Sequence, residues 1–150
     1  MPNNESGFYP PVGFYFKVNI IGISGVNEGS FQEVSGLNVK LGTEEIKEGG
    51  ENRFTHRLPS YPKYENLVLK RGMLTDSSLI TWARKAIEQF TITPTTVVLN
   101  LMDEQSSPLA TWKFVKAYPV GIKVSDFKAQ ENAIVVETLE LCFDYFERVK

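Results

Sequence analysis

Apolar and polar side chains alternate in the first apolar stretch of the chain. Phe14, Phe16, Val18 and Ile20 occupy every second position, with Lys17 and Asn19 among the residues between them. Successive side chains of a β-strand point to opposite faces, so this alternation predicts a strand with one face on a core. Glycines at positions 22, 25 and 29 predict a turn, and a second short strand is expected over residues 30–34.

A hairpin is predicted in the next part of the chain. Residues 37–48 and 53–58 are two β-like runs, and Gly49, Gly50, Glu51 and Asn52 supply the turn between them. The prolines at 59 and 62 predict a loop that contains Leu58 and Pro59. A further strand is expected over residues 66–71.

The spacing of apolar residues changes after Gly72 from two to three and four. This spacing predicts one helix, with Asp76 or Ser77 as its N-terminal cap. The residues expected on its core-facing side are Leu79, Trp82, Ala86 and Phe90.

The second half of the chain again has strand patterns. They cover residues 95–102, 110–117, 120–124 and 134–146, and Pro119 separates the second from the third. The sequence therefore predicts a mainly β fold, a sandwich or barrel of about seven to nine strands with one flanking helix and an extended charged hairpin. We expect residues 1–12 to be a flexible or extended arm and residues 13–150 to be one domain.

Composition supports a folded domain and excludes several classes of partner. The chain has 150 residues, 42% of them hydrophobic and 12% aromatic, which is enough for a core. Its net charge of −2 argues against nucleic-acid sequence recognition. No run approaches the roughly 20 apolar residues of a membrane span, and no signal peptide is visible. We therefore expect no stable membrane insertion, and synthesis without a secretory signal.

Few residues offer chemistry. Cys142 is the single cysteine and His56 the single histidine, so neither a disulfide nor a Cys/His metal centre is expected. We expect His56 to face solvent on a strand and Cys142 to be a small apolar strand residue. No nucleophile elbow or phosphate-binding glycine loop is present. We therefore predict that the chain is not an enzyme and that it needs no cofactor.

The hairpin is unusually polar for a β-ribbon. Residues 42–57 contain seven charged side chains, and only Ile46 and Phe54 are substantially apolar. An isolated hairpin is marginal in water, so this one either lies loose on the surface or docks outside its own domain. The unpaired edges of the strands also allow two interpretations. Charges and Pro119 keep the edges of a monomer from pairing, or the edges pair with identical neighbouring subunits in a ring.

Several motifs resemble one family. They are E-E-I-K-E-G-G-E-N at 44–52, R-L-P at 57–59, Y-E-N-L-V-L-K-R-G at 64–72, Trp82 in the helix, W-K-F at 112–114, A-Y-P-V at 117–120 and E-T-L-E-L at 137–141. In this order they resemble the tail-tube proteins of contractile phages, a family that includes the inner-tube proteins of extracellular contractile injection systems and phage-tail-like particles.

The resemblance implies a structural role. It implies β-barrel subunits in hexameric rings, which stack into a hollow inner tube inside a contractile sheath and are propelled through a target membrane. Its implied partners are further copies of itself, sheath and baseplate proteins and luminal cargo for delivery, within an extracellular or phage-like particle. The implied inter-subunit residues are Glu44, Ile46, Glu48, Gly49, Gly50, Glu51, Asn52, Arg53, Phe54 and Arg57.

Two departures from the family pattern leave an alternative open. Ser60 follows Leu58-Pro59 where the family commonly has glycine, and residues 142–148 are more aromatic than the usual ending. A specialised tube-initiator ring at the baseplate end of the same machine is therefore the alternative. A monomeric small-ligand-binding barrel, with aromatic strand residues around a cavity, is a more distant one.

Overall fold

The computed structural model describes residues 14–23, 27–47, 49–50, 53–73, 77–126 and 135–150. The N-terminal arm predicted over residues 1–12, and the predicted interface residues Glu48, Glu51 and Asn52, lie outside these ranges. Side chains are described for the same ranges except residues 27–30.

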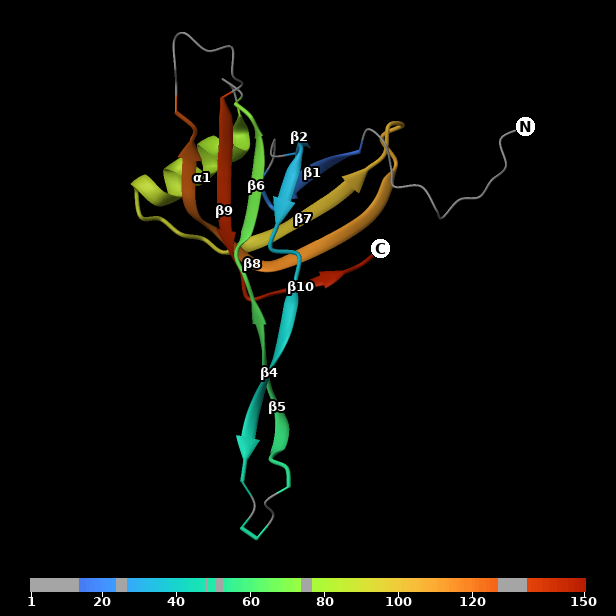
Figure 1. Ribbon diagram of the computed structural model, residues 1–150. Helices are drawn as coiled ribbons and strands as arrows, with labels where there is room; N and C mark the ends of the chain where they lie inside the picture. The colour runs from blue at the N-terminus through green and yellow to red at the C-terminus, as the bar shows by residue number, and fades with distance from the viewer. Residues whose placement is uncertain (1–13, 24–26, 48, 51–52, 74–76, 127–134) are drawn as a thin grey trace, which may run out of the picture.

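The fold is mainly β, as predicted, with one helix (Figure 1). Its elements are β1 (Tyr15–Ile20), β2 (Asn27–Phe31), β3 (Glu33–Ser35), β4 (Val39–Ile46), β5 (His56–Tyr64), β6 (Leu67–Gly72), α1 (Ser78–Glu88), β7 (Thr95–Met102), β8 (Pro108–Val124), β9 (Val136–Cys142) and β10 (Tyr145–Arg148). The described residues thus form ten strands instead of seven to nine, because two predicted strands are each divided in two and two others form one strand.

The main sheet curls into a half-barrel. Its strand order is β2-β1-β7-β8-β9-β6-β3, with β10 added beside β8. The strands at the two ends of this order, β2 and β3, follow each other in the chain with only Gln32 between them. The backbone N–H of Gln32 donates to the carbonyl of Lys70 in β6 over 3.1 Å. A single kinked stretch of chain therefore brings the two ends of the sheet together.

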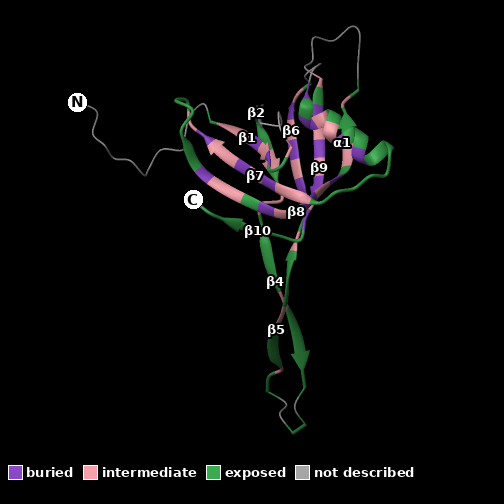
Figure 2. Cartoon of the chain, turned by 180° about the vertical axis from the view of Figure 1, so that it is seen from behind, coloured by how far each residue is buried: buried purple, intermediate pink, exposed green. Residues whose placement is uncertain are grey.

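The core lies inside the curl, and buried residues recur along the strands of the main sheet, whereas β4 and β5 are almost wholly exposed (Figure 2). In β1 the alternation predicted from the sequence is confirmed at Val18 and Ile20, which are fully buried. β6, β7, β8 and β9 contribute buried residues in the same way. The largest of the fully buried side chains are Phe31, Phe114, Ile20, Leu67, Leu69, Leu79, Leu99, Leu139 and Leu141.

The helix begins where the sequence predicted and ends earlier. The hydroxyl of Ser77 accepts a hydrogen bond from the backbone N–H of Ile80 over 3.1 Å, which caps the first turn. Leu79 and Ala86 are buried and Trp82 is half-buried against the core. The prediction that Phe90 lies on the core face is wrong. Phe90 follows the last turn with φ +50° and is 86% exposed, because the chain reverses there.

The two strands predicted around Pro119 form one long strand, β8. Pro119 lies within it at an irregular register between Pro119 and Gly121, where a missing backbone N–H is tolerated. The predicted strand 134–146 is instead divided into β9 and β10. Both halves nevertheless pair with β8 in one continuous register, with Tyr118 opposite Cys142 and Val115 opposite Tyr145. The interruption lies opposite Lys116, whose φ of +54° bends β8.

The loop predicted for Leu58 and Pro59 is also wrong, because β5 continues through both residues and through Pro62. Pro59 lies opposite Thr43 and Pro62 opposite Leu41. Among the described strands β5 pairs only with β4, so a proline can turn its missing N–H toward the unpaired edge without removing a ladder hydrogen bond.

A buried ion pair ties the helix to the sheet. Arg71 of β6 and Glu137 of β9 are opposite each other in the register and are 2% and 4% exposed. Their side chains approach to 3.8 Å between Nε and Oε2. The guanidinium also donates to the hydroxyl of Ser77, the helix cap, and lies 4.4 Å from the centre of the Phe31 ring. One cation thus joins two strands, the start of α1 and the end of β2.

We predict that Arg71→Met strongly destabilises the fold. The substitution leaves the Glu137 carboxylate buried without its cation, which costs about 3–5 kcal/mol in such pairs. Lys70→Met is the control, because Lys70 pairs with Glu33 at 3.7 Å on the surface and such pairs contribute at most about 1 kcal/mol. Urea unfolding of both variants measures the difference, and equal midpoints would contradict the structural role of Arg71.

Candidate assembly interface

The β4–β5 hairpin projects away from the rest of the protein as a two-stranded arm (Figures 1 and 2). We call residues 39–64 the arm. Seven of the eight residues of β4 and seven of the nine residues of β5 are exposed. The two strands pair with each other and, among the described strands, with no third one. The arm therefore offers both of its faces to a partner.

Aromatic rings hold the base of the arm against the body. Tyr64, the last residue of β5, lies 5.8 Å from the ring centre of Phe143 and 5.3 Å from that of Phe146. Phe114 completes this cluster, with its ring centre 4.9 Å from that of Phe143. Edge-to-face contacts of this kind each add about 0.5–1.5 kcal/mol beyond area burial. The arm thus leaves the body in a fixed direction.

A close backbone approach fixes the opposite strand at the same place. Gly36, three residues before β4, has φ +95° and lies against the start of β6. A Cβ on Gly36 would come within 2.2 Å of the carbonyl oxygen of Asn66. The two segments that carry the arm are therefore held together by a contact that only glycine permits.

The arm exposes more apolar surface than the sequence indicated. The hairpin predicted from the charged run had two substantially apolar residues, Ile46 and Phe54. The structure extends the ribbon toward the body, because β5 passes through the prolines. The exposed apolar residues of the arm are Val39, Leu41, Ile46, Phe54, Leu58 and Tyr61. Val39 and Leu41 already lay within the strand predicted over residues 37–48, and the part that the prediction lacked is the continuation of β5 through residues 59–64.

The exposed apolar residues of the arm lie on both faces of the ribbon. Val39 and Leu41 share one face of the pleat, whereas Ile46 and Leu58, opposite Glu44, share the other. The ribbon is twisted, and its two strands cross in projection halfway along the arm (Figures 1 and 2). We call Val39, Leu41, Ile46 and Leu58 together the apolar strip.

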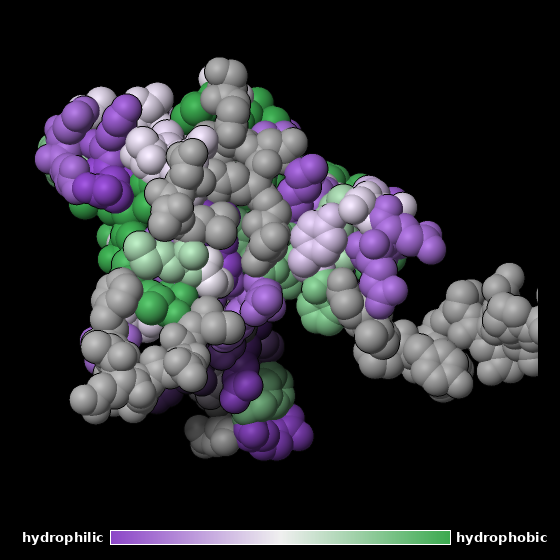
Figure 3. Space-filling model, turned by 90° about the horizontal axis from the view of Figure 1, so that it is seen from above, coloured by the Kyte–Doolittle hydropathy of each residue, from purple (hydrophilic) through white to green (hydrophobic). Residues whose placement is uncertain are grey.

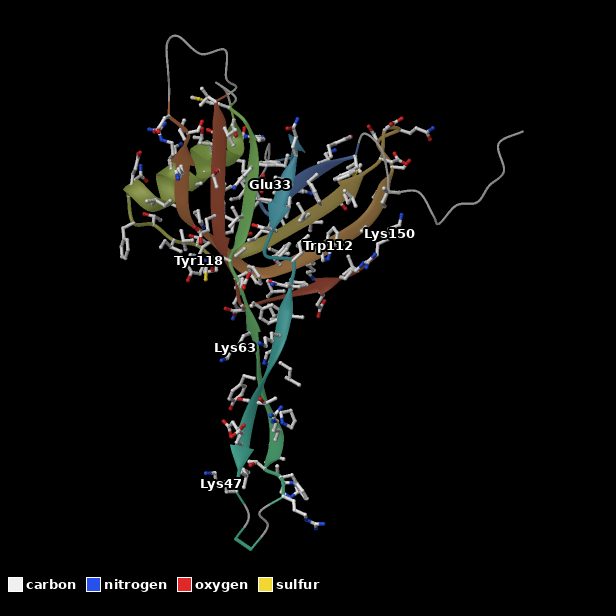
Figure 4. All side chains as sticks on the ribbon, viewed as in Figure 1. Glu33, Lys47, Lys63, Trp112, Tyr118 and Lys150 are labelled. Carbon is white, nitrogen blue, oxygen red and sulfur yellow. The ribbon has the colours of Figure 1, made fainter. Side chains whose placement is uncertain are left out.

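Charged groups flank the apolar strip. Glu45 and Arg57 lie opposite each other, with 3.9 Å between Oε1 and Nε, and both are exposed. Figure 4 labels Lys47 beside the tip of the arm and Lys63 nearer its base. Of the other predicted interface residues, Glu44 lies in β4, Gly49 and Gly50 in the turn, and Arg53 and Phe54 between the turn and β5. All of these are exposed.

A second accessible surface is the outer face of the strands β1, β7, β10 and the first half of β8. The inner face of this sheet carries the core, and the residues that alternate with the core are mainly polar, although Val98 and Val115 are among them. Thr111 donates to the side-chain carbonyl of Asn100 across the face over 2.7 Å. The polar members of this outer face are Lys17, Asn19, Asn100, Thr111, Lys113 and Glu147. We call it the polar sheet face.

The two candidate chemical residues lie far apart in the fold. His56 begins β5 in the outer half of the arm, with its ring 5.1 Å from that of Phe54. Cys142 ends β9 in the body, where a hydrogen bond with its thiol raises the pKa of Tyr118. The described residues contain no group of three potential metal ligands. Within the same ranges, no helix has the length and apolarity that crossing a membrane requires.

Residues 12–147 match the family described as T4-like virus tail tube protein gp19. The match spans nearly the whole chain and confirms the resemblance read from the motifs. No curated protein sequence is significantly similar to the chain.

Solved structures of contractile systems share the fold. A chain in the cryo-EM structure of the anti-feeding prophage (AFP) baseplate is 28% identical over 94% of this chain and 96% of its own, with a TM-score of 0.79. A chain in the PVC extracellular contractile injection system sheath-tube complex is 23% identical over 95% of each chain, with a TM-score of 0.74. Hcp1 from Flavobacterium johnsoniae is more distant, at 13% identity over 89% of this chain and 94% of its own, with a TM-score of 0.50.

We predict that Gly36→Ala destabilises the base of the arm. The new methyl group clashes with the Asn66 carbonyl, and a non-glycine residue at positive φ adds about 1–3 kcal/mol of strain. Gly22→Ala is the matched control, since Gly22 has φ +88° but a Cβ added there would meet no atom within 4 Å. Thermal and urea unfolding should show a larger loss for Gly36→Ala, and equal losses would contradict the close approach.

Proposed function

The chain belongs to the T4-like virus tail tube protein family and is a tail tube protein of a contractile injection system; we propose that it forms hexameric rings that stack into the hollow inner tube. On this proposal the chain has no catalytic role. The tube transmits the force of sheath contraction and is propelled through the target membrane.

The exposed arm is the observation that carries this proposal. It presents an apolar strip to solvent, yet its base is held in one direction by the aromatic cluster around Tyr64. Because the arm points away from the body, its apolar surface cannot pack against the body. It can be buried only against another molecule. When such a projection contacts a different surface on the next copy, the contact is heterologous, and repetition yields rings or filaments.

The edge of β10 supports ring closure. β10 pairs with β8 along one edge, and among the described strands no other strand pairs with it. An unpaired strand edge is a template for another chain. We propose that neighbouring subunits join their sheets here, so that backbone hydrogen bonds run around the ring.

The polar sheet face suits the lumen of the tube. Its strands form the layer that neighbouring sheets would extend, and its side chains mix both charge signs, with Lys113 opposite Glu147. A surface of this kind stays hydrated and does not hold a passing macromolecule by apolar contact. We propose that this face lines the channel and that hydrophilic cargo moves along it.

The partners follow from this architecture. We propose that the outer surface of the tube faces the sheath proteins and that its end ring rests on the baseplate. We also propose that the subunits are made and assembled in the bacterial cytoplasm and reach the outside as part of the particle, to which the family belongs.

One comparison favours a second candidate role, the initiator ring at the baseplate end. The chain in the AFP baseplate structure has higher identity and a higher TM-score than the one in the PVC sheath-tube complex, 28% and 0.79 against 23% and 0.74. An initiator forms single rings and requires baseplate partners to nucleate a tube, whereas a main-tube subunit polymerises through identical rings. Electron microscopy of the purified protein at high concentration separates the two roles.

We predict that Leu58→Asp abolishes assembly and leaves the subunit folded. Leu58 is 46% exposed in the arm, so the substitution costs little in the monomer, but it places a charge on the apolar strip. Electron microscopy should show rings or tubes for the unchanged protein and none for the variant. Circular dichroism should give the same spectrum for both.

Leu58→Met is the control, because it retains apolar surface at the same position. It should assemble as the unchanged protein does. Assembly of Leu58→Asp to the same extent would show that the arm is no interface. An unchanged protein that stays monomeric, alone and with its baseplate partners, would contradict the proposed function itself.

We predict that a cysteine on the polar sheet face becomes shielded in the tube. In a Cys142→Ser background, Lys113→Cys should react in free subunits both with a small maleimide and with a maleimide on a large dextran. In assembled tubes only the small reagent should react quickly, because the large one cannot cross the tube wall. Mass spectrometry and gel shifts measure the two reactions.

Ser78→Cys, at the exposed start of α1, is the control on a surface that does not belong to the polar sheet face. It should react with both reagents in free subunits and in tubes. Rapid reaction of Lys113→Cys with the dextran reagent in intact tubes would contradict the assignment of this face to the lumen and leave the tube itself established.

A further inference from the structure

An open apolar groove runs between α1 and the second half of β8. Its volume is about 590 Å³, and its floor consists of Val120, Ile122 and Val124, which alternate along one face of the strand. Ile80 and Ile87 of α1 form its wall. Figure 3 shows hydrophobic surface next to strongly hydrophilic surface on the side of the molecule that carries α1.

The helix leaves this groove uncovered because its buried side points elsewhere. Leu79, Ala83 and Ala86 pack into the body. Ile80 and Ile87 lie on a neighbouring stripe of the helix surface, seven residues apart. Ile87 is 41% and Val120 43% exposed. The groove is therefore a second apolar surface that the subunit does not cover among its described residues.

The arm of the same subunit does not reach this groove. It leaves the body on the side away from α1, and its tip lies at the far end of the molecule (Figures 1 and 4). The apolar strip of the arm and the groove beside α1 can therefore meet only between two copies of the chain.

The charges around the two surfaces are complementary. The groove is bordered by Arg84 and Glu88, an exposed pair with 3.3 Å between Nη2 and Oε1. On the arm, Glu44 lies on the same face of the ribbon as Ile46 and Leu58, whereas Glu45 and Arg57 project from the other face. An arm that binds the groove would bury Ile46 and Leu58 and bring the Glu44 carboxylate near the Arg84 guanidinium, a charge of opposite sign.

We propose that the α1–β8 groove is the seat for the apolar strip of a neighbouring subunit's arm. The proposal rests on the proposed function and specifies which two surfaces of the subunit meet. Arm and groove are different parts of the chain, so each copy receives one arm and offers another. The contact then propagates from copy to copy and does not close as a twofold dimer.

Two variants test this pairing. Ile46→Asp impairs the arm and leaves the groove intact, and Ile87→Asp impairs the groove and leaves the arm intact. At concentrations at which the β10 edges alone do not hold subunits together, each variant alone should stay monomeric in analytical ultracentrifugation. An equimolar mixture should form a heterodimer that grows no further, because the arm of the Ile87→Asp protein enters the groove of the Ile46→Asp protein.

Ile92→Asp is the matched control. Ile92 has the same 41% exposure as Ile87 but does not line the groove. This variant should assemble as the unchanged protein does. All three substitutions replace exposed side chains, and circular dichroism and urea unfolding should show that each variant folds.

Cross-linking gives an independent readout. In a Cys142→Ser background, proteins with Ile46→Cys and Val120→Cys are mixed and treated with a short bismaleimide. We expect one dominant cross-link between the two cysteines, identified by mass spectrometry. A partner carrying Ile92→Cys in place of Val120→Cys should give little product.

The outcomes separate this proposal from the proposed function. If the unchanged protein and Ile87→Asp form tubes equally well and no 46–120 cross-link appears, the groove is not the seat, although the tube is established. If the unchanged protein forms no tubes and no cross-link appears, both proposals are overturned.

Discussion

The bend of β8 at Lys116 is the constraint on which the rest of the fold depends. On one side of the bend β8 pairs with β7 and β10, and on the other mainly with β9. The backbone N–H of Asp144 donates to the carbonyl of Val115 over 3.0 Å, so the register continues through the corner. Phe143 turns inward there and meets Phe114 and Tyr64. One corner thus bends the curled sheet and anchors the arm.

The same corner explains how a polar ribbon remains an ordered projection. A two-stranded hairpin gains little from its own pairing in water, so its direction must come from its base. Aromatic packing at Tyr64 and the glycine contact at Gly36 provide this on the two segments that carry the arm. Because the base is fixed, binding to a neighbour does not have to order the whole arm, and less of the binding free energy is lost to ordering.

Periodicity predicted the fold class and most strands, because one face of each strand lies on a common core. Periodicity could not show where a strand tolerates proline, because that depends on whether a second strand pairs with the edge to which the proline nitrogen points. The predicted strand that corresponds to β5 was therefore too short. Phe90 was placed on the helix because its spacing fits, but helix length is decided by where the chain must turn back. For the candidate interface, the sequence located the charged arm, whereas the groove joins α1 to β8 and has no local pattern.

The uncovered apolar surface of the arm and of the α1–β8 groove fits the proposed assembly. Monomeric soluble proteins rarely leave a contiguous apolar surface uncovered. In this subunit the groove beside α1 is open, and Leu41 and Tyr61 are exposed on the arm. Here the groove and the arm are both kept, on different sides of the subunit, and the arm points away from its own groove. On the proposed arm–groove contact, two such surfaces that cannot meet within one chain are buried together between successive copies, and the single subunit leaves both of them uncovered.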